Sequence, residues 1–479
     1  ARDVILVRNM ISNFRPVAIG PVTSVGNMYL GPFYYYFMAP WLLLSGFHPV
    51  GPAIGVGIIS LATIVLIYVL GRKIIGEKAA LFSAILFAFA EMAIFHARFS
   101  WNPNLAPLFT ILVLYFIYMA LTKNSKNWIW VGLCLGLTIQ LHYVNLLLVG
   151  GCGLIWLYQL FTELISKKSK LQTKEKKRFI VNTVIGAAVA LLTMTTVFMF
   201  DIRHNGLNFQ AAINIFARDG NFASNYASLA SSLVDALLET MGRTAHIVVD
   251  LAVPGIDVHY PKVITGILLL ATFAFVAYKE KKTGIRIGVM MILALIITSI
   301  IGISFYRNSV FDHYILFAVP LSLMAMGYLL SKLWQYKIYK YVAVILVAIF
   351  IVQNASHRDF GFHGPQYSQR LAVAQTIVDA NPKNEPFTIT LFIPAYESGD
   401  HYGLRYQYLT SMLGHTPLIP EKLYQTQTLF IIDEMVGASP RDIINSPIYA
   451  VVRFGIDGSR IENIYQAFEN GTLVYKLVK

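Results

Sequence analysis

Basic and aromatic side chains gather in short polar stretches that border apolar runs of the sequence. Arg203 and His204 directly follow one such run, and Arg307 and His313 lie in a second cluster before another. A guanidinium group donates paired hydrogen bonds to phosphate oxygens, and an imidazole adds a further donor. The pattern predicts that these four residues bind a phosphate group. A surface ion pair between Asp201 and Arg203 explains the first cluster equally well.

Two further polar stretches provide candidate substrate-binding residues. Trp101 and Asn102 lie in a Ser-Trp-Asn-Pro-Asn turn between two apolar runs, and His142 lies in a Gln-Leu-His-Tyr stretch between two others. Tyr314 follows His313 at the start of a late run. Pro and Asn favour turns, and Trp anchors membrane interfaces. These side chains are predicted to bind substrate, although structural turns and packing between helices account for them as well.

No metal or cofactor site is predicted. The sequence contains no HExxH, Walker or GxSxG motif. His246 and His259 lie with nearby aspartates in a long loop, but without tight spacing, so a divalent metal is possible there and is not indicated. Cys134 and Cys152 lie inside apolar runs, where buried thiols are expected rather than a disulfide or a zinc site.

The composition is that of an integral membrane protein. The 479 residues are 56% hydrophobic and 13% charged, whereas soluble domains carry about 25% charged residues. The mean hydropathy is +0.59. The net charge of +13 comes mainly from Lys and Arg in short loops between apolar runs. Such residues set membrane topology, so the basic charge does not indicate a nucleic-acid partner.

Ten apolar runs are long enough to cross a bilayer, whose core is about 30 Å thick and needs roughly 20 apolar residues per helix. We predict spans at residues 50–71, 79–95, 105–121, 128–141, 144–161, 179–200, 263–278, 285–305, 315–330 and 341–352. Alternate connections are rich in Lys and Arg, which makes them cytoplasmic by the positive-inside rule. The segments predicted to lie on the outer side of the membrane are then residues 1–49, 96–104, 201–262, 306–314 and 354–479.

After the last span the composition changes to that of a small α/β domain. Segments typical of strands occur at 387–393, 428–432, 448–452 and 473–477, and helical segments occur at 371–380, 402–413 and 461–468. Alternating strands and helices favour an α/β fold. The predicted fold class is mainly α. Residues 1–353 form a polytopic helical membrane domain with outer loops at 1–49 and 201–262, and residues 354–479 form an extracytoplasmic α/β domain.

The opening stretch, residues 1–49, is predicted to lie on the outer membrane surface. It begins with an amphipathic run, continues through a Gly- and Pro-rich passage, and ends in an aromatic helix that Pro40 interrupts. That helix is too short for a comfortable span. Because the chain opens outside the membrane without an apolar leader, we expect a further membrane helix upstream of Ala1.

Residues 31–36 read Gly-Pro-Phe-Tyr-Tyr-Tyr and contain Tyr34 and Tyr35. This element, the Trp-Asn-Pro turn at 101–103, the Asp-Ile-Arg-His stretch at 201–204 and the His-Tyr pair at 313–314 together resemble the GT-C glycosyltransferases. The similarity is greatest to the protein-mannosyltransferase-like branch, family 39, which includes bacterial enzymes that transfer aminoarabinose to lipid A. It covers the chain from residue 1 to about 352. The resemblance implies that Tyr34 and Tyr35 help to line the donor site.

The resemblance also implies transfer of a sugar from a polyprenyl-phosphate donor to a protein, lipid or glycan acceptor on the outer face. Members place an acidic residue, often Asp-Glu, in the first outer loop as catalytic base. A carboxylate takes the proton of the acceptor hydroxyl while a cation stabilises the departing lipid phosphate, and this single displacement inverts the anomeric centre. Asp3 is the only carboxylate in residues 1–49, so it is the candidate catalytic residue. If the family's acidic pair lies upstream of Ala1, the chain as numbered is inactive.

A transporter or flippase of lipid-linked sugars is the alternative function. Such proteins are commonly built from two related halves with broken helices, and the sequence shows neither feature clearly. A non-catalytic scaffold is a third interpretation, against which the outer Arg and His clusters argue. The predicted location is the plasma membrane, and the predicted partners are a polyprenyl-phosphate sugar, membrane lipid and the acceptor, with no nucleic acid.

Overall fold

The chain forms two compact units. The computed structural model describes residues 2–23, 28–165, 173–217, 238, 242–243, 247, 249, 259–304, 310–357, 367–392, 403–418, 425–434, 439–444, 460–467 and 472–479. One unit is Arg15–Arg358, which we call the membrane unit. The other, which we call the C-terminal unit, combines Ala1–Phe14 with Asp359–Lys479.

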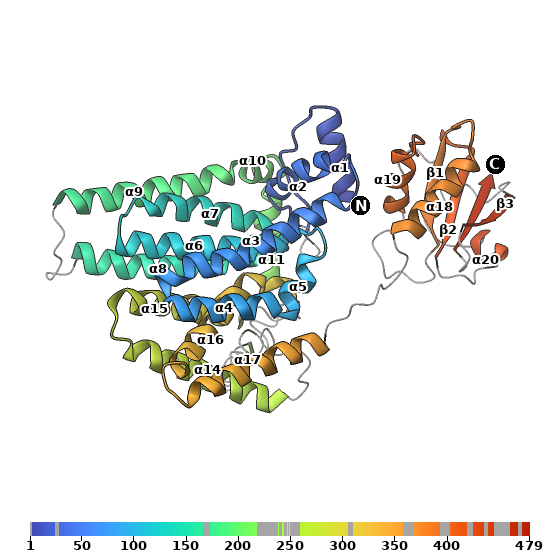
Figure 1. Cartoon of the computed structure of the whole chain (residues 1–479). Coiled ribbons are helices and arrows are strands. Elements are labelled where there is room, and N and C mark those ends of the chain that lie inside the picture. Colours follow the sequence, from blue (N-terminus) through green and yellow to red (C-terminus); the bar gives the residue numbers. More distant parts are fainter. Residues whose placement is uncertain are drawn as a thin grey trace, which may run out of the picture. The chain divides into compact units, whose positions relative to one another are not determined.

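The membrane unit is a bundle of apolar helices (Figure 1). Among the described residues, seven helices have the length and composition of a membrane span, and two bent helix pairs bring the number to as many as nine; one further apolar helix is shorter than a span. They are α3 (Gly51–Ile74), α4 (Glu77–Phe89) with α5 (Glu91–Ala97), α6 (Ala106–Thr122), α7 (Asn127–Leu141), α8 (Leu146–Leu160), α9 (Thr173–Thr193) with α10 (Thr195–Arg203), α14 (His259–Lys279), α15 (Thr283–Ser304), α16 (Val319–Leu333) and α17 (Tyr339–Ser356). Each coincides with one predicted apolar run, so the predicted helical membrane fold is confirmed.

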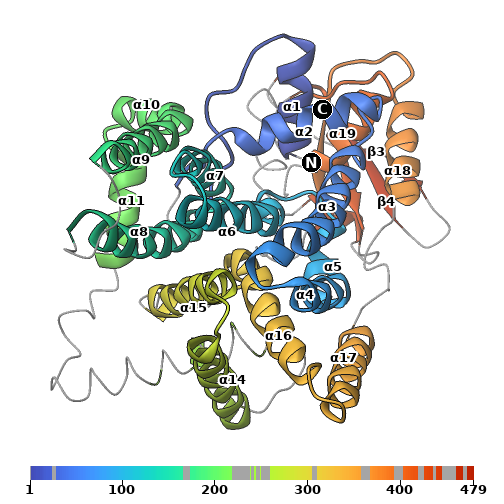
Figure 2. The ribbon, with the colours of Figure 1, turned by 60° about the vertical axis from the view of Figure 1, so that its left-hand side comes forward.

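Small residues let neighbouring helices of the bundle approach closely. Gly132 of α7 faces Gly186 of α9, where a methyl group on Gly132 would lie 1.9 Å from the Gly186 carbonyl oxygen. Gly327 of α16 packs in the same way on Ser83 of α4. Lipid tails are as apolar as Leu side chains, so helices in a bilayer associate through such close contacts. Figure 2 shows α7 beside α9 in the resulting arrangement.

Two spans are broken. The pair α4 and α5 bends by 60°, and the pair α9 and α10 bends by 53°. A bend leaves backbone groups without their helical partners, and inside a membrane these groups need others. The Asn354 side chain of α17 accepts the Glu91 N–H at 2.8 Å, and Gln140 Nε2 donates to the Thr193 carbonyl at 2.9 Å. The sequence predicts continuous helices here, so both breaks are findings of the structure.

The Gly- and Pro-rich passage of the opening stretch forms a short antiparallel ladder that leads into α2 (Phe33–Leu44). The Gly20 N–H donates to the Leu30 carbonyl at 2.8 Å, and Val22 pairs with Tyr29. Gly20 has no room for a side chain, since a methyl group there would lie 2.0 Å from the Gly31 carbonyl oxygen. The aromatic helix predicted after this passage is present.

The C-terminal unit contains a four-stranded sheet in the order β1-β2-β4-β3. Its strands are β1 (Phe387–Leu391), β2 (Thr428–Asp433), β3 (Arg460–Gln466) and β4 (Leu473–Val478). The β1–β2 pair is parallel, and β4 is antiparallel to both β2 and β3. Helices α18 (Tyr367–Asp379) and α19 (Leu404–Met412) cover one face, and α20 (Pro440–Ile444) covers the other. The predicted α/β fold is confirmed. The strand predicted at 448–452 lies outside the described residues.

The predicted helix at 461–468 is wrong, because Arg460–Gln466 forms strand β3. Ile461, Ile464 and Tyr465 are spaced three and four residues apart, which is the pattern of a helix face. In the structure a register shift between Ile461 and Asn463 interrupts the pairing with β4. Such a bulge breaks the two-residue alternation of a regular strand. β3 is also an edge strand with mostly exposed side chains, so its apolar pattern is weak.

Helix α1 (Arg2–Ser12) packs on α19 within the C-terminal unit. Val4, Val7 and Met10 form its buried face at three-residue spacing. The Arg8 guanidinium carbon lies 5.6 Å from the centroid of the Tyr408 ring, which is a cation–π contact. Residues 1–14, which begin the predicted outer loop, therefore belong to the same compact unit as residues 359–479.

Candidate functional site

Four of the predicted residues meet at one end of the membrane unit. Trp101 precedes the 3-10 turn Asn102–Leu105, His142 lies between α7 and α8, and His313 and Tyr314 lie in the 3-10 turn Asp312–Tyr314 ahead of α16. The ring centroids of Trp101 and His313 are 4.4 Å apart, those of His142 and His313 are 5.6 Å apart, and those of His142 and Tyr314 are 5.0 Å apart. Three connections that are distant in sequence thus form one aromatic group, which we call the rim cluster.

Buried amides fix the connections that carry these rings. Asn102 is only 5% exposed, and its Nδ2 donates to the Leu141 carbonyl at the end of α7. Asn145 Nδ2 donates to the Thr138 carbonyl at 2.8 Å. A buried amide must be paired because leaving it unpaired is costly. Asn102, predicted to bind substrate, therefore holds the turn against α7 and orients its neighbour Trp101.

Tyr34 and Tyr35 are buried in the protein, at 1% and 2% exposure. The Tyr34 hydroxyl lies 2.7 Å from the Ser100 hydroxyl, directly before Trp101 in the chain. Gln140 anchors the start of the same helix, since its Oε1 accepts the Phe33 N–H at 3.3 Å. Tyr34 thus ties α2 to the rim cluster.

The two histidines of the rim cluster are neutral at physiological pH. Burial and the nearby His313 imidazole lower the pKa of His142 to about 3, and burial and the nearby His96 imidazole lower the pKa of His313 to about 4. His142 Nδ1 accepts the Val144 N–H at 3.3 Å, so its proton resides on Nε2. His313, predicted to bind phosphate, therefore offers a neutral N–H donor and no positive charge.

The end of α10 holds the second predicted group. Asn205 and Gly206 have left-handed backbones, with φ of 55° and 73°, and the Gly206 N–H donates to the Asp201 carbonyl at 2.8 Å. This is the usual way in which a helix ends at a residue that tolerates positive φ. It leaves Arg203 and His204 exposed at the last turn.

The predicted Asp201–Arg203 ion pair is not formed. The Asp201 carboxylate accepts the Asn208 N–H at 2.6 Å, and Arg203 makes no ion pair with any residue in the described part of the chain. The His204 ring stacks on Phe200 with centroids 4.0 Å apart, and its Nδ1 lies 2.7 Å from the Phe200 carbonyl. His204 can therefore donate to a phosphate only through Nε2, in its protonated form.

Asn208 joins the end of α10 to the rim cluster. Its Oδ1 accepts the Tyr29 N–H at 2.7 Å, and its Nδ2 lies 3.1 Å from the Tyr29 carbonyl and 3.4 Å from the Tyr143 hydroxyl. Tyr143 directly follows His142. Asn208 is absent from the residues predicted to matter, and nothing in its polar sequence surroundings distinguishes it.

His96 is a second residue that the sequence does not single out. It is buried at the end of α5, and its Nδ1 lies 3.0 Å from Asn104 Oδ1. His96 and Asn104 line a small pocket together with Thr63 and Leu316. The feature of the sequence that could have identified His96 is its position as a single histidine at the end of an apolar run.

The roles predicted for two further residues stay predictions. Arg307 lies outside the described residues. Asp3 lies in the C-terminal unit, where Arg2 Nε is 3.0 Å from its carboxylate. In the ranges that the structure describes, no set of three or more His, Cys, Asp or Glu is placed to hold a metal ion.

Comparisons with known proteins agree with the resemblance seen in the sequence. Residues 30–200 match the family model described as dolichyl-phosphate-mannose-protein mannosyltransferase. ArnT from Cupriavidus metallidurans has 14% identity and TM-scores of 0.54 in the apo state and 0.53 with undecaprenyl phosphate bound, with 99% of this chain and 92% of ArnT covered. The Archaeoglobus fulgidus oligosaccharyltransferase, solved with a tethered acceptor peptide, has 14% identity and a TM-score of 0.51, with 99% of this chain and 69% of that chain covered. No curated protein matches significantly.

At 14% identity the solved structures show that this chain shares their fold, so the predicted resemblance and the predicted helical membrane fold are confirmed. The apolar helices and the shared fold support a multi-pass membrane protein.

Proposed function

Because this chain has the fold of the GT-C glycosyltransferases and matches the mannosyltransferase family over residues 30–200, we propose that it transfers a sugar from a polyprenyl-phosphate donor to an acceptor on the outer face of the membrane. The observation that carries the proposal is the convergence of the rim cluster and the end of α10, which Asn208 joins. That arrangement supplies a cation for the phosphate and rings for the sugar.

Arg203 is proposed to bind the donor phosphate. It is exposed at the end of α10 and pairs with no carboxylate among the described residues. As the glycosidic bond breaks, negative charge grows on the lipid phosphate, and a fixed guanidinium stabilises that charge more than it stabilises the intact donor. His204 adds a donor in its protonated form, and Arg307 is proposed for the same role.

The rim cluster is proposed to bind the sugar. Trp101 presents an apolar ring face, and the neutral imidazoles of His142 and His313 each carry one N–H donor. A sugar has apolar C–H faces and several hydroxyl groups, which match such surroundings. Tyr34, Tyr35 and Asn102 are buried, and they are proposed to hold these rings in place.

Asp3 is proposed as the catalytic base that takes the proton of the acceptor hydroxyl. Its carboxylate lies in the first turn of α1, 3.0 Å from Arg2 Nε. The resulting single displacement inverts the anomeric centre.

The test uses the full chain in proteoliposomes with a radiolabelled polyprenyl-phosphate sugar. Transfer of label to an acceptor, lost on substitution of Arg203, supports the proposal. The two bent spans keep a flippase as the second candidate, because broken helices are common in transporters. Movement of intact donor across the bilayer without transfer would establish that function instead.

A further inference from the structure

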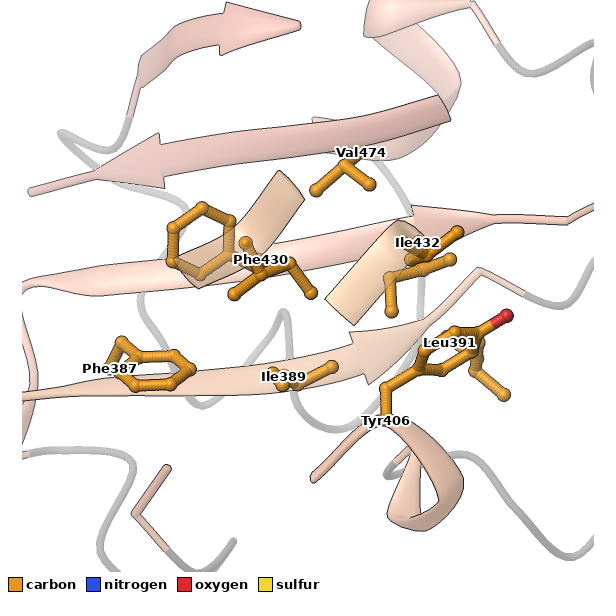
Figure 3. Packing of buried hydrophobic residues seen from close by; sticks show 9 residues of the cluster. Phe387, Ile389, Leu391, Tyr406, Phe430, Ile432 and Val474 are labelled. Atoms are coloured by element: carbon orange, nitrogen blue, oxygen red, sulfur yellow. The ribbon is translucent and has the colours of Figure 1, made fainter. Parts of the chain in front are cut away.

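The C-terminal unit has a polar group at one edge of its sheet. Strands β1 and β2 are parallel, so their carboxyl ends, at Leu391 and Asp433, lie at the same edge. In open α/β sheets, ligands bind outside the carboxyl ends of parallel strands. Figure 3 shows the Tyr406 ring beside Leu391, with its hydroxyl oxygen directed toward this edge.

A carboxylate lies at the centre of this group. Glu434 directly follows β2, and its Oε1 accepts a hydrogen bond from the Tyr406 hydroxyl. Its Oε2 lies 3.6 Å from Arg405 Nη1, and the two side chains are 20% and 31% exposed. Glu434 is thus held in place by two partners from α19 and remains accessible to a ligand.

Arg370 of α18 supplies a second guanidinium group. Helices α18 and α19 pack side by side on the same face of the sheet. The charges of Arg370 and Arg405 counteract the rise in pKa that burial and Glu434 impose on the Tyr406 hydroxyl, so both arginines lie near that group. Arg370 Nε is buried and has no hydrogen-bond partner among the residues that the structure describes. A buried donor without an acceptor is costly and is rare in native proteins.

We propose that Arg370, Arg405, Tyr406 and Glu434 form a binding site for an anionic sugar. Its carboxylate or phosphate group binds the two guanidinium groups, and a sugar hydroxyl donates to Glu434. Two guanidinium groups beside one carboxylate leave the site positively charged, and guanidinium forks match carboxylate and phosphate oxygens. Binding here does not require the transfer reaction; that the ligand belongs to the acceptor rests on the proposed function.

The experiment is calorimetric titration of the full chain in nanodiscs, without polyprenyl donor. The probes are glucuronate, glucose 6-phosphate, inorganic phosphate and glucose. We expect glucuronate or glucose 6-phosphate to bind, and Arg370→Gln and Arg405→Gln each to weaken that binding about tenfold or more, as loss of a charge-assisted hydrogen bond does. The matched control, Arg441→Gln, removes an exposed arginine from α20 on the other face and should leave the affinity unchanged.

Equal binding of glucose and glucuronate, no binding of either anionic sugar, or equal weakening by Arg441→Gln would each overturn the proposal. Inorganic phosphate binding as tightly as glucose 6-phosphate would overturn the sugar assignment. If Arg370→Gln does not fold, Arg370→Lys replaces it, since lysine retains the charge but lacks the fork. Because no donor is present, loss of transfer activity leaves this result unaffected, and the two proposals fail separately.

Discussion

Replacing Arg203 with alanine should separate donor binding from folding. Arg203 is exposed at the end of α10 and forms no ion pair with the described residues. Surface substitutions usually change the free energy of unfolding by about 0.5 kcal/mol or less, and loss of a cation at a helix C-terminus adds about 0.3–1 kcal/mol. We therefore expect Arg203→Ala to fold and to reach the membrane in nearly normal amounts.

The expected effect on transfer is much larger. A hydrogen bond to a charged group contributes roughly 1.5–3 kcal/mol, and a guanidinium donates two such bonds to a phosphate. Loss of about 3 kcal/mol of transition-state stabilisation lowers kcat/KM for the donor roughly 100-fold, because about 1.4 kcal/mol corresponds to a factor of ten. Arg203→Lys, which keeps the charge without the fork, should fall between these values.

The assay compares initial rates of label transfer with the melting temperature and the folded yield of each variant. Arg72→Ala is the matched control, since Arg72 is an exposed arginine in the last turn of α3, on the predicted cytoplasmic side. An unchanged kcat/KM in Arg203→Ala would refute the phosphate-binding role. Parallel losses in yield and in transfer would show that Arg203 acts structurally.

Three further substitutions test other parts of the reasoning. Asp3→Asn should abolish turnover without changing folded yield, and normal turnover would remove Asp3 as the base. Trp101→Ala should raise KM for the donor about tenfold, since an aromatic contact and ring burial are lost; an unaltered KM would exclude the rim cluster from the sugar site. Lys332 forms an ion pair with the buried Glu280 carboxylate. Lys332→Met should therefore lower the free energy of unfolding, measured in detergent, by about 2 kcal/mol, a value between those typical of exposed and of buried ion pairs. Burial raises the pKa of Glu280, but hydrogen bonds from Lys332, Tyr328 and a backbone amide outweigh it and lower that pKa from 4.5 to about 2. The contribution of Glu280 is therefore complete above pH 4.5 and is lost as the pH falls toward 2, and Lys332→Met should flatten this dependence.

The spans were predictable because the bilayer makes length and apolarity nearly sufficient for a helix. The breaks in them were not. Neither Ala90 nor Met194 is a glycine or proline, and the freed backbone groups are satisfied by Asn354 and Gln140 from other helices. Since those partners are distant in sequence, only the packed bundle reveals them. In the C-terminal unit, the buried strands β1, β2 and β4 have continuous β-type runs, whereas the bulge in β3 gives it the spacing of a helix.

The candidate site was predictable to the extent that its residues are chemically distinctive. Trp101, His142 and His313 were selected as aromatic or imidazole side chains at the ends of apolar runs, and the structure brings them together. Which of them carry charge was not predictable, because burial among other rings keeps both imidazoles neutral. The absence of an ion pair between Asp201 and Arg203 was not predictable either, because it depends on the turn after α10, which brings the Asn208 N–H to the Asp201 carboxylate.

The amides around the site explain why its reactive groups remain accessible. Asn102, Gln140, Asn145 and Asn208 are all buried, and each is hydrogen-bonded to the backbone of another segment or turn. Because a buried amide without partners is costly, these side chains are committed to holding connections together and have little capacity left for a ligand. The rigid frame that they form means that Trp101 and Arg203 need not contribute to stability. In such a site the amides position the connections, and the rings and the cation bind the ligand. This division holds the binding groups in a fixed geometry that a flexible surface loop would not provide.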